Sequence, residues 1–200
     1  MISGRLRRVR DTLRMCVLAM AVSCTGASAQ AILVTELLAG LAGVERSSAT
    51  FEETRTVAAL TAPIVRRGSL RYVRPDSLEM VVVSPTPERI EIKGEQLTLE
   101  SRSGTKRVRL SELPAVAAWV ESVRATLAGD HDALRRYFDV RASGSMAAWA
   151  LELTPLDNEL ASFVSRIKID GTQARVTRIE ISERAGDRSV MTIAATDGRR

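Results

Sequence analysis

The stretch Gly68–Met80, with the sequence GSLRYVRPDSLEM, decides how the rest of the chain is interpreted. Its first half alternates, so that Leu70, Tyr72 and Arg74 share one face of an extended strand. Proline follows, and after this turn Leu78, Met80 and Val82 repeat the same two-residue spacing. The stretch therefore predicts two antiparallel strands joined by a tight corner.

Arg74 is the inconsistent residue on the apolar face of the first strand. Either it lies at the rim, where the strand leaves the apolar surface, or its charge is used inside a cavity. Charged groups are rarely buried without a partner, so the local pattern by itself favours the rim.

The amino terminus predicts export from the cytoplasm. Five arginines lie between Arg5 and Arg14, an apolar run follows over 15–22, and Ala27–Ala29 offers a small-x-small cleavage site before Gln30. Residues 1–29 are therefore predicted to be a secretory signal peptide, too short for a stable membrane span. Two alternatives stay open: a retained membrane anchor, and lipidation at Cys24, although residues 21–24 fit a lipoprotein signal poorly.

Removal of this segment changes what the composition implies. It takes away five arginines and one aspartate, so the formal net charge falls from +5 to +1. The basic character thus belongs mostly to the export signal, and a nucleic-acid partner is not supported. Both cysteines, Cys16 and Cys24, lie in the removed segment, which leaves no disulfide or thiolate chemistry. Residues 30–200 are long enough for one domain with its own core.

The mature sequence alternates between apolar and polar residues over about eleven short segments with brief connections, as antiparallel strands do. A leading amphipathic helix is expected over 31–41. Helical spacing over 114–138 predicts a two-helix insertion, which begins at Pro114 and breaks at Gly129. Between Val176 and Ile179 the alternation changes parity, which indicates a bulge. The predicted fold is α+β but mainly β: a curved antiparallel sheet of about eleven strands, forming an incomplete barrel covered by a helical lid.

This order of elements resembles the LolA/LolB family of outer-membrane lipoprotein carriers. The resemblance covers nearly the whole mature chain. It rests on the leading helix, Phe51-x-Glu53 in the first strand, the signature over 68–75, and the helices after the sixth strand. The family resemblance implies an acyl-chain cavity inside the barrel, and it implies that Arg74 hydrogen-bonds the lid and steadies its closed form. The chain is poorer in aromatic residues than such carriers, so a divergent member with another acylated cargo is expected.

The apolar faces of the strands and the lid have two interpretations, a filled core or a lined cavity; the resemblance favours the cavity. Its expected lining residues are Phe51, Leu70, Tyr72, Leu78, Met80, Val82, Ile90, Ile92, Leu97, Leu99, Trp119, Val120, Val123, Trp149 and Leu151.

Catalytic and metal-binding patterns are scarce in this sequence. The one histidine, His131, follows Asp130 at the expected start of a helix, which favours a solvated helix cap over a site. No nucleophile elbow or glycine-rich phosphate loop occurs. Glu53 and Arg55 share a strand face and are interpreted either as an ion pair or as solvated charges. We therefore expect no enzyme activity, no metal and no cofactor.

The expected function is that of a monomeric periplasmic carrier for the acyl chains of a lipoprotein, or of another acylated lipid or glycolipid. Its partners would be an inner-membrane donor complex and an outer-membrane acceptor. Two alternatives remain: a lipid-sensing or regulatory interaction module on the same scaffold, and an enzyme acting on an acylated substrate.

Overall fold

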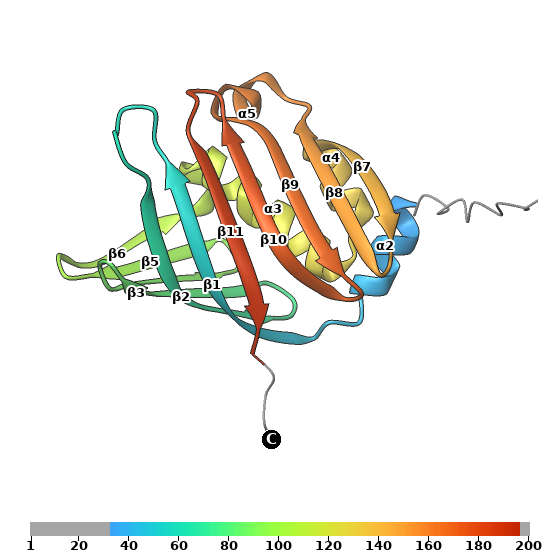
Figure 1. The fold of residues 1–200 in the computed structure, drawn as a ribbon, viewed down its shortest axis with the longest axis horizontal. Helices are drawn as coiled ribbons and strands as arrows, with labels where there is room; N and C mark the ends of the chain where they lie inside the picture. The colour runs from blue at the N-terminus through green and yellow to red at the C-terminus, as the bar shows by residue number, and fades with distance from the viewer. Residues whose placement is uncertain (1–32, 197–200) are drawn as a thin grey trace, which may run out of the picture.

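The computed structural model describes residues 33–196, except for the side chains of Pro114, Ala115, Ala118 and Trp119. The predicted signal peptide, both cysteines and the first two residues of the expected leading helix lie outside this range. Within it, the chain forms one eleven-stranded antiparallel sheet and four α-helices (Figure 1).

The strands run along the sheet in an order that places the first and last strands side by side. From edge to edge the order is β6-β5-β4-β3-β2-β1-β11-β10-β9-β8-β7. Their bounds are β1 Arg46–Thr56, β2 Ile64–Val73, β3 Ser77–Ser84, β4 Glu88–Lys93, β5 Gln96–Ser101, β6 Gly104–Arg109, β7 Phe138–Ser145, β8 Ala148–Pro155, β9 Val164–Thr172, β10 Arg175–Glu183 and β11 Arg188–Ala195. The chain thus winds from the centre to one edge, crosses through its helices, and winds back. Because β6 and β7 remain edges, the barrel is incomplete, as predicted.

The helices are α2 (Val34–Leu41), α3 (Pro114–Ala128), α4 (His131–Tyr137) and α5 (Asn158–Phe163), with a 3-10 turn η1 at Leu110–Glu112. In the view of Figure 1, α3 and α4 lie behind the strands β8 to β11, whereas α5 lies at the end of the sheet near the β10–β11 turn. The mainly β fold with a helical cover is therefore confirmed.

Local sequence signals set the ends of the helices. Pro114 lies in the first turn of α3, where its missing N–H costs nothing. Gly129 ends α3 in the left-handed conformation, with φ 71°. The carboxylates of Asp130 and Asp157 accept backbone N–H groups at the starts of α4 and α5. The solvated-cap interpretation of the 130–132 run agrees with this geometry.

Two irregularities bend the sheet. The register between β9 and β10 shifts between Val176 and Arg178, which confirms the bulge expected from the change of parity. A second shift between β2 and β3 lies next to Gly68, where an added Cβ would collide with the Val81 carbonyl. Only glycine allows the two backbones to approach this closely.

The buried side chains form two clusters. The larger one joins α2 and the inward faces of β8 and β9 to Phe51, Met80 and Val82 on the central strands. The smaller one is Ile92 on β4, Leu110 on η1 and Val120 on α3. The lid helix α3 contributes Ala125 to the larger cluster and Val120 to the smaller one, so it packs against both.

Candidate functional site

An apolar cavity of about 370 Å³ lies on the concave side of the sheet. Its walls come from β1, β2, β3, β4, β10 and β11, and from Val116, Val123 and Leu127 on α3. Most of the wall is aliphatic, because alternate residues of each strand point inward and these positions are apolar over the middle of the strands. The volume lies near the lower end of the roughly 300–1,000 Å³ usual for ligand pockets.

About half of the expected lining residues are part of this wall. They are Leu70, Tyr72, Leu78, Met80, Ile90, Ile92 and Val123. All but Val123 lie on the three consecutive strands β2, β3 and β4, whose register places them next to one another. The two-residue spacing of the stretch from Gly68 onward thus located one side of the cavity.

The other expected lining residues do not border the cavity. Phe51, Val82, Trp149 and Leu151 are instead packed against other buried side chains in the larger core cluster. Val120 is packed in the smaller cluster with Leu97 at its margin, and Leu99 is half-buried on β5 opposite Ile90. The side chain of Trp119 lies outside the described part of the chain.

The opposite wall was missed by the sequence interpretation. It is formed by Val176, Ile179 and Ile181 on β10 and by Met191 and Ile193 on β11. The signal that could have found it is the alternating spacing within each strand, of Ile179 with Ile181 and of Met191 with Ile193, combined with the expectation that a barrel brings the last strand beside the first.

One end of the cavity carries charged side chains on the inward faces of β1 and β2. Glu53 is 7% exposed and accepts hydrogen bonds at 2.7 Å from Arg66 Nε and at 2.6 Å from Ser189 Oγ. Arg66 also lies 3.9 Å from the sulfur of Met80 and 3.7 Å from Glu88. A buried carboxylate is tolerated here because a cation and a hydroxyl satisfy it.

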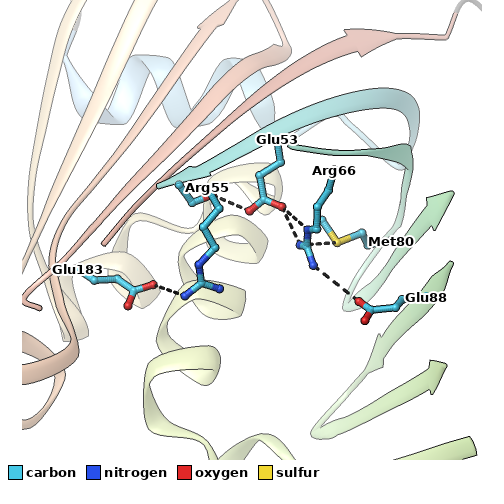
Figure 2. Close-up of polar contacts among 7 residues, drawn as sticks. Glu53, Arg55, Arg66, Met80, Glu88 and Glu183 are labelled. Atoms are coloured by element: carbon cyan, nitrogen blue, oxygen red, sulfur yellow. Dashed lines mark hydrogen bonds and ion pairs between the residues drawn. The ribbon is translucent and has the colours of Figure 1, made fainter. Parts of the chain in front are cut away.

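Arg55 reaches the other way along the same end of the cavity. Its Nη2 lies 3.1 Å from Glu183 and 3.7 Å from Asp187, on the strands and turn that follow β9. Figure 2 shows Glu53 between Arg55 and Arg66, with Glu183 on the Arg55 side and Glu88 on the Arg66 side. Glu53 and Arg55 therefore share a face but pair with different residues. We call Glu53, Arg55, Arg66, Glu88, Glu183 and Asp187 the charged cluster.

Tyr72 lies towards the other end of the cavity wall, opposite Ser47 in the β1–β2 register. Its side chain is 3% exposed, and its hydroxyl is one of two buried polar side-chain atoms without a hydrogen-bond partner in the described part of the chain. Burial raises the pKa of this phenol, against the opposing effect of the nearby Arg74 and Arg124 charges. The hydroxyl therefore remains protonated at neutral pH.

Arg74 contacts the lid helix. Its Nη2 donates a hydrogen bond of 3.0 Å to the carbonyl oxygen of Ala128, the last residue of α3. A cation at this point also complements the carbonyl end of the helix. The contact agrees with the geometry expected for a latch, while its effect on opening stays a prediction.

Arg124 on α3 makes a larger set of contacts at the same junction and was not singled out from the sequence. Its Nη2 donates hydrogen bonds to the carbonyl oxygens of Asp76 at 2.5 Å and Gly94 at 2.8 Å, in the β2–β3 and β4–β5 turns. Its side chain is only 8% exposed and also pairs with Glu121 at 3.1 Å. Arg124 follows Val120 by one helical turn, so its place on the apolar stripe was the available signal.

The described residues 33–196 contain no group of three or more acidic, histidine or cysteine side chains placed to hold a metal ion. Among the helices of that range, none has the length and apolar character needed to cross a membrane. His131 borders a separate, shallower pocket with Leu33, Arg135 and Leu156, away from the residues of the apolar cavity.

Comparison with solved structures gives distant similarities. A LolA superfamily protein, NE2245 from Nitrosomonas europaea, is 13% identical with a TM-score of 0.45, over 82% of this chain and 92% of that one. The Mycobacterium tuberculosis lipoprotein LppX is 10% identical with a TM-score of 0.44, over 82% and 93%. A putative outer membrane lipoprotein-sorting protein domain from Vibrio parahaemolyticus is 11% identical with a TM-score of 0.40, over 84% and 92%. No curated protein matches the chain.

A protein-family model gives the decisive comparison. The model described as "Outer membrane lipoprotein carrier protein LolA-like" matches residues 26–199, which include every described strand and helix. The chain therefore belongs to the LolA-like family of outer-membrane lipoprotein carrier proteins.

Proposed function

We propose that the protein is a periplasmic carrier that holds the acyl chains of a lipoprotein, or of another acylated lipid or glycolipid, in its cavity and moves this cargo towards the outer membrane. The observation that carries the proposal is the aliphatic cavity enclosed between the incomplete barrel and α3. Membership of the LolA-like family supports the same class of ligand.

The wall suits an acyl chain and requires no chemical step. Burial of each CH₂ group contributes about 0.8 kcal/mol, so a long chain binds strongly without any directional contact. The binding is reversible, the carrier is not an enzyme, and neither a metal nor a cofactor takes part in it. Residues of the wall need only be apolar, which explains why aliphatic side chains serve as well as aromatic ones.

Movement of the lid helix would ease loading and release. Val116, Val123 and Leu127 of α3 form part of the wall, so displacement of α3 widens the cavity. Arg124 and Arg74 hold the carboxyl-terminal half of α3 against the sheet. We propose that an inner-membrane donor complex displaces this contact during loading and that an outer-membrane acceptor does so during release, with the carrier acting as a monomer.

Lipid extraction tests the proposal directly. The protein is purified from its native periplasm beside two variants, Leu70→Trp and Val83→Trp. Leu70 lines the cavity, whereas Val83 is 62% exposed and does not border it. We expect acylated lipid with the natural protein and with Val83→Trp, and a loss of lipid with Leu70→Trp, because the indole fills the space.

Three results would contradict the carrier. If the natural protein is recovered without lipid although donor membranes are available, it does not carry a lipid ligand. If Leu70→Trp is folded by circular dichroism and contains as much lipid as the natural protein, the cavity is not the lipid-binding site. Capture of a membrane regulator with bound lipid but no transfer between vesicles would favour a sensing module instead.

A further inference from the structure

The Tyr72 hydroxyl is a polar group whose place in the fold is not explained by the protein's own contacts. It is buried, and none of the described residues forms a hydrogen bond with it. Removing a hydroxyl from water without a new partner costs free energy. A phenylalanine at this position would keep the ring packing and avoid that cost, so the ring alone does not account for the tyrosine.

The charged neighbours of this hydroxyl are Arg74, Arg124 and Asp76, and the Nε of Arg124 is also without a hydrogen-bond partner among the described residues. Arg74 and Arg124 lie close enough for their charges to act on the phenol. Arg74 donates to the carbonyl of Ala128, and Arg124 donates to the carbonyls of Asp76 and Gly94. These three backbone carbonyls thus accept from guanidinium groups, and the Asp76 carboxylate forms no hydrogen bond with Tyr72. The hydroxyl is therefore free to donate to an acceptor from outside the chain.

The cavity is the place from which such an acceptor can come, because Tyr72 is one of its lining residues. Resting on the proposed carrier function, we propose that the Tyr72 hydroxyl donates a hydrogen bond to the carbonyl oxygen of the ester or amide that joins the acyl chain to the cargo's head. Two arginines against the single charge of Asp76 make the surroundings electropositive, which favours a carbonyl oxygen at this point.

This assignment gives the bound cargo a direction. Tyr72 lies opposite Ser47 on β1, and the charged cluster begins at Glu53 and Arg55 on the same strand. The strand rises by about 3.3 Å per residue, so Ser47 and Arg55 are about 26 Å apart. An acyl chain anchored at Tyr72 therefore extends along the aliphatic wall towards the charged cluster. The hydroxyl is covered in the present form, so the bond belongs to the loaded form, after the end of α3 has shifted.

A pair of lysophosphatidylcholines tests the proposal with the purified full-length mature protein. One probe carries a palmitoyl chain through an ester, and the other carries a hexadecyl chain through an ether, which lacks the carbonyl. Binding of both is measured by calorimetry for the natural protein, Tyr72→Phe and Tyr137→Phe. Tyr137 is the matched control, because it is 44% exposed and does not border the cavity.

We expect the natural protein and Tyr137→Phe to prefer the ester, and Tyr72→Phe to bind the ester about threefold to tenfold more weakly with its ether affinity unchanged. The ligand-free Tyr72→Phe protein should unfold at the same temperature or higher, since it has lost an unsatisfied group. An unchanged preference for the ester in Tyr72→Phe would overturn the inference, as would equal weakening for both probes. If the natural protein binds neither probe, the carrier function itself fails, which is a different result.

Discussion

Removal of the Arg124 guanidinium should release the lid helix without unfolding the sheet. Arg124 donates to two backbone carbonyls, at 2.5 and 2.8 Å, and its side chain is 8% exposed. Hydrogen bonds from a charged donor contribute about 1.5–3 kcal/mol each, which gives about 3–6 kcal/mol before the desolvation of the charge is subtracted. In Arg124→Met the aliphatic stem is kept, so we expect the docking of α3 to weaken by about 2–3 kcal/mol.

Arg74→Met should have a much smaller effect on the same helix. Its single hydrogen bond to Ala128 is 3.0 Å long and exposed to solvent. An exposed charged contact at a helix end contributes about 0.3–1 kcal/mol. The two variants therefore distinguish the large contribution of Arg124 to the docking of α3 from the small contribution of Arg74, although both arginines lie at the same junction.

Hydrogen exchange of the α3 amides is the assay for both variants. A loss of 2–3 kcal/mol corresponds to roughly 30-fold to 150-fold faster exchange in Arg124→Met, against about twofold to fivefold in Arg74→Met. Arg141→Met, on β7 and 78% exposed, provides a control that should leave α3 unchanged. Equal or greater loss of protection in Arg74→Met would refute the reasoning, and so would exchange in Arg124→Met that rises equally in β1 and β11.

Three further predictions concern stability. Arg66→Met leaves the Glu53 carboxylate buried without its cation and should lower the free energy of unfolding in urea by about 3–5 kcal/mol. The double variant Glu53→Leu with Arg66→Met should recover much of this stability. Equal losses in the single and the double variant would contradict a buried ion pair. The hydrogen bond from Arg188 holds the pKa of Glu180 below its ordinary 4.5. The stabilising contribution of the Glu180 carboxylate is therefore present above pH 4.5 and is lost as the pH falls through the lowered pKa. Glu180→Gln should flatten this part of the stability–pH curve, and an unchanged curve would refute the prediction. Gly129→Ala should lower stability by about 1–2 kcal/mol in thermal unfolding, because φ is positive and a Cβ would meet the Leu38 carbonyl; an unchanged melting temperature would count against this strain.

The positions of the strands and the helical cover could be predicted because they depend on local patterns. Two-residue alternation located the strands on both sides of the Pro75 corner, and the change of parity after Val176 located the bulge. Pro114, Gly129 and Asp130 located the ends of the lid helices. These signals act within a few residues, so no knowledge of the tertiary contacts was needed.

The boundary between core and cavity could not be predicted in the same way. Leu70 and Val82 both face inward at apolar positions, yet Leu70 borders the cavity and Val82 is packed in the larger core cluster with Phe51. Alternation reports only which side of the sheet a residue faces. Whether the space in front of it is filled depends on which segments, distant in the sequence, come to lie there.

The ion pairs of the charged cluster also could not be predicted from the sequence, and they determine where the aliphatic wall of the cavity ends. The spacing of Glu53 and Arg55 predicted that they share a strand face. Their partners Arg66 and Glu183 lie on β2 and β10, so the sequence did not indicate which residues they pair with. These ion pairs occupy inward positions that would otherwise extend the aliphatic wall. An acyl chain gains nothing from lying against paired charges, because it would displace their water without providing hydrogen bonds. Under the proposed carrier function, the charged cluster would mark the end of the wall available to an acyl chain, and the apolar middle would be the part that holds it.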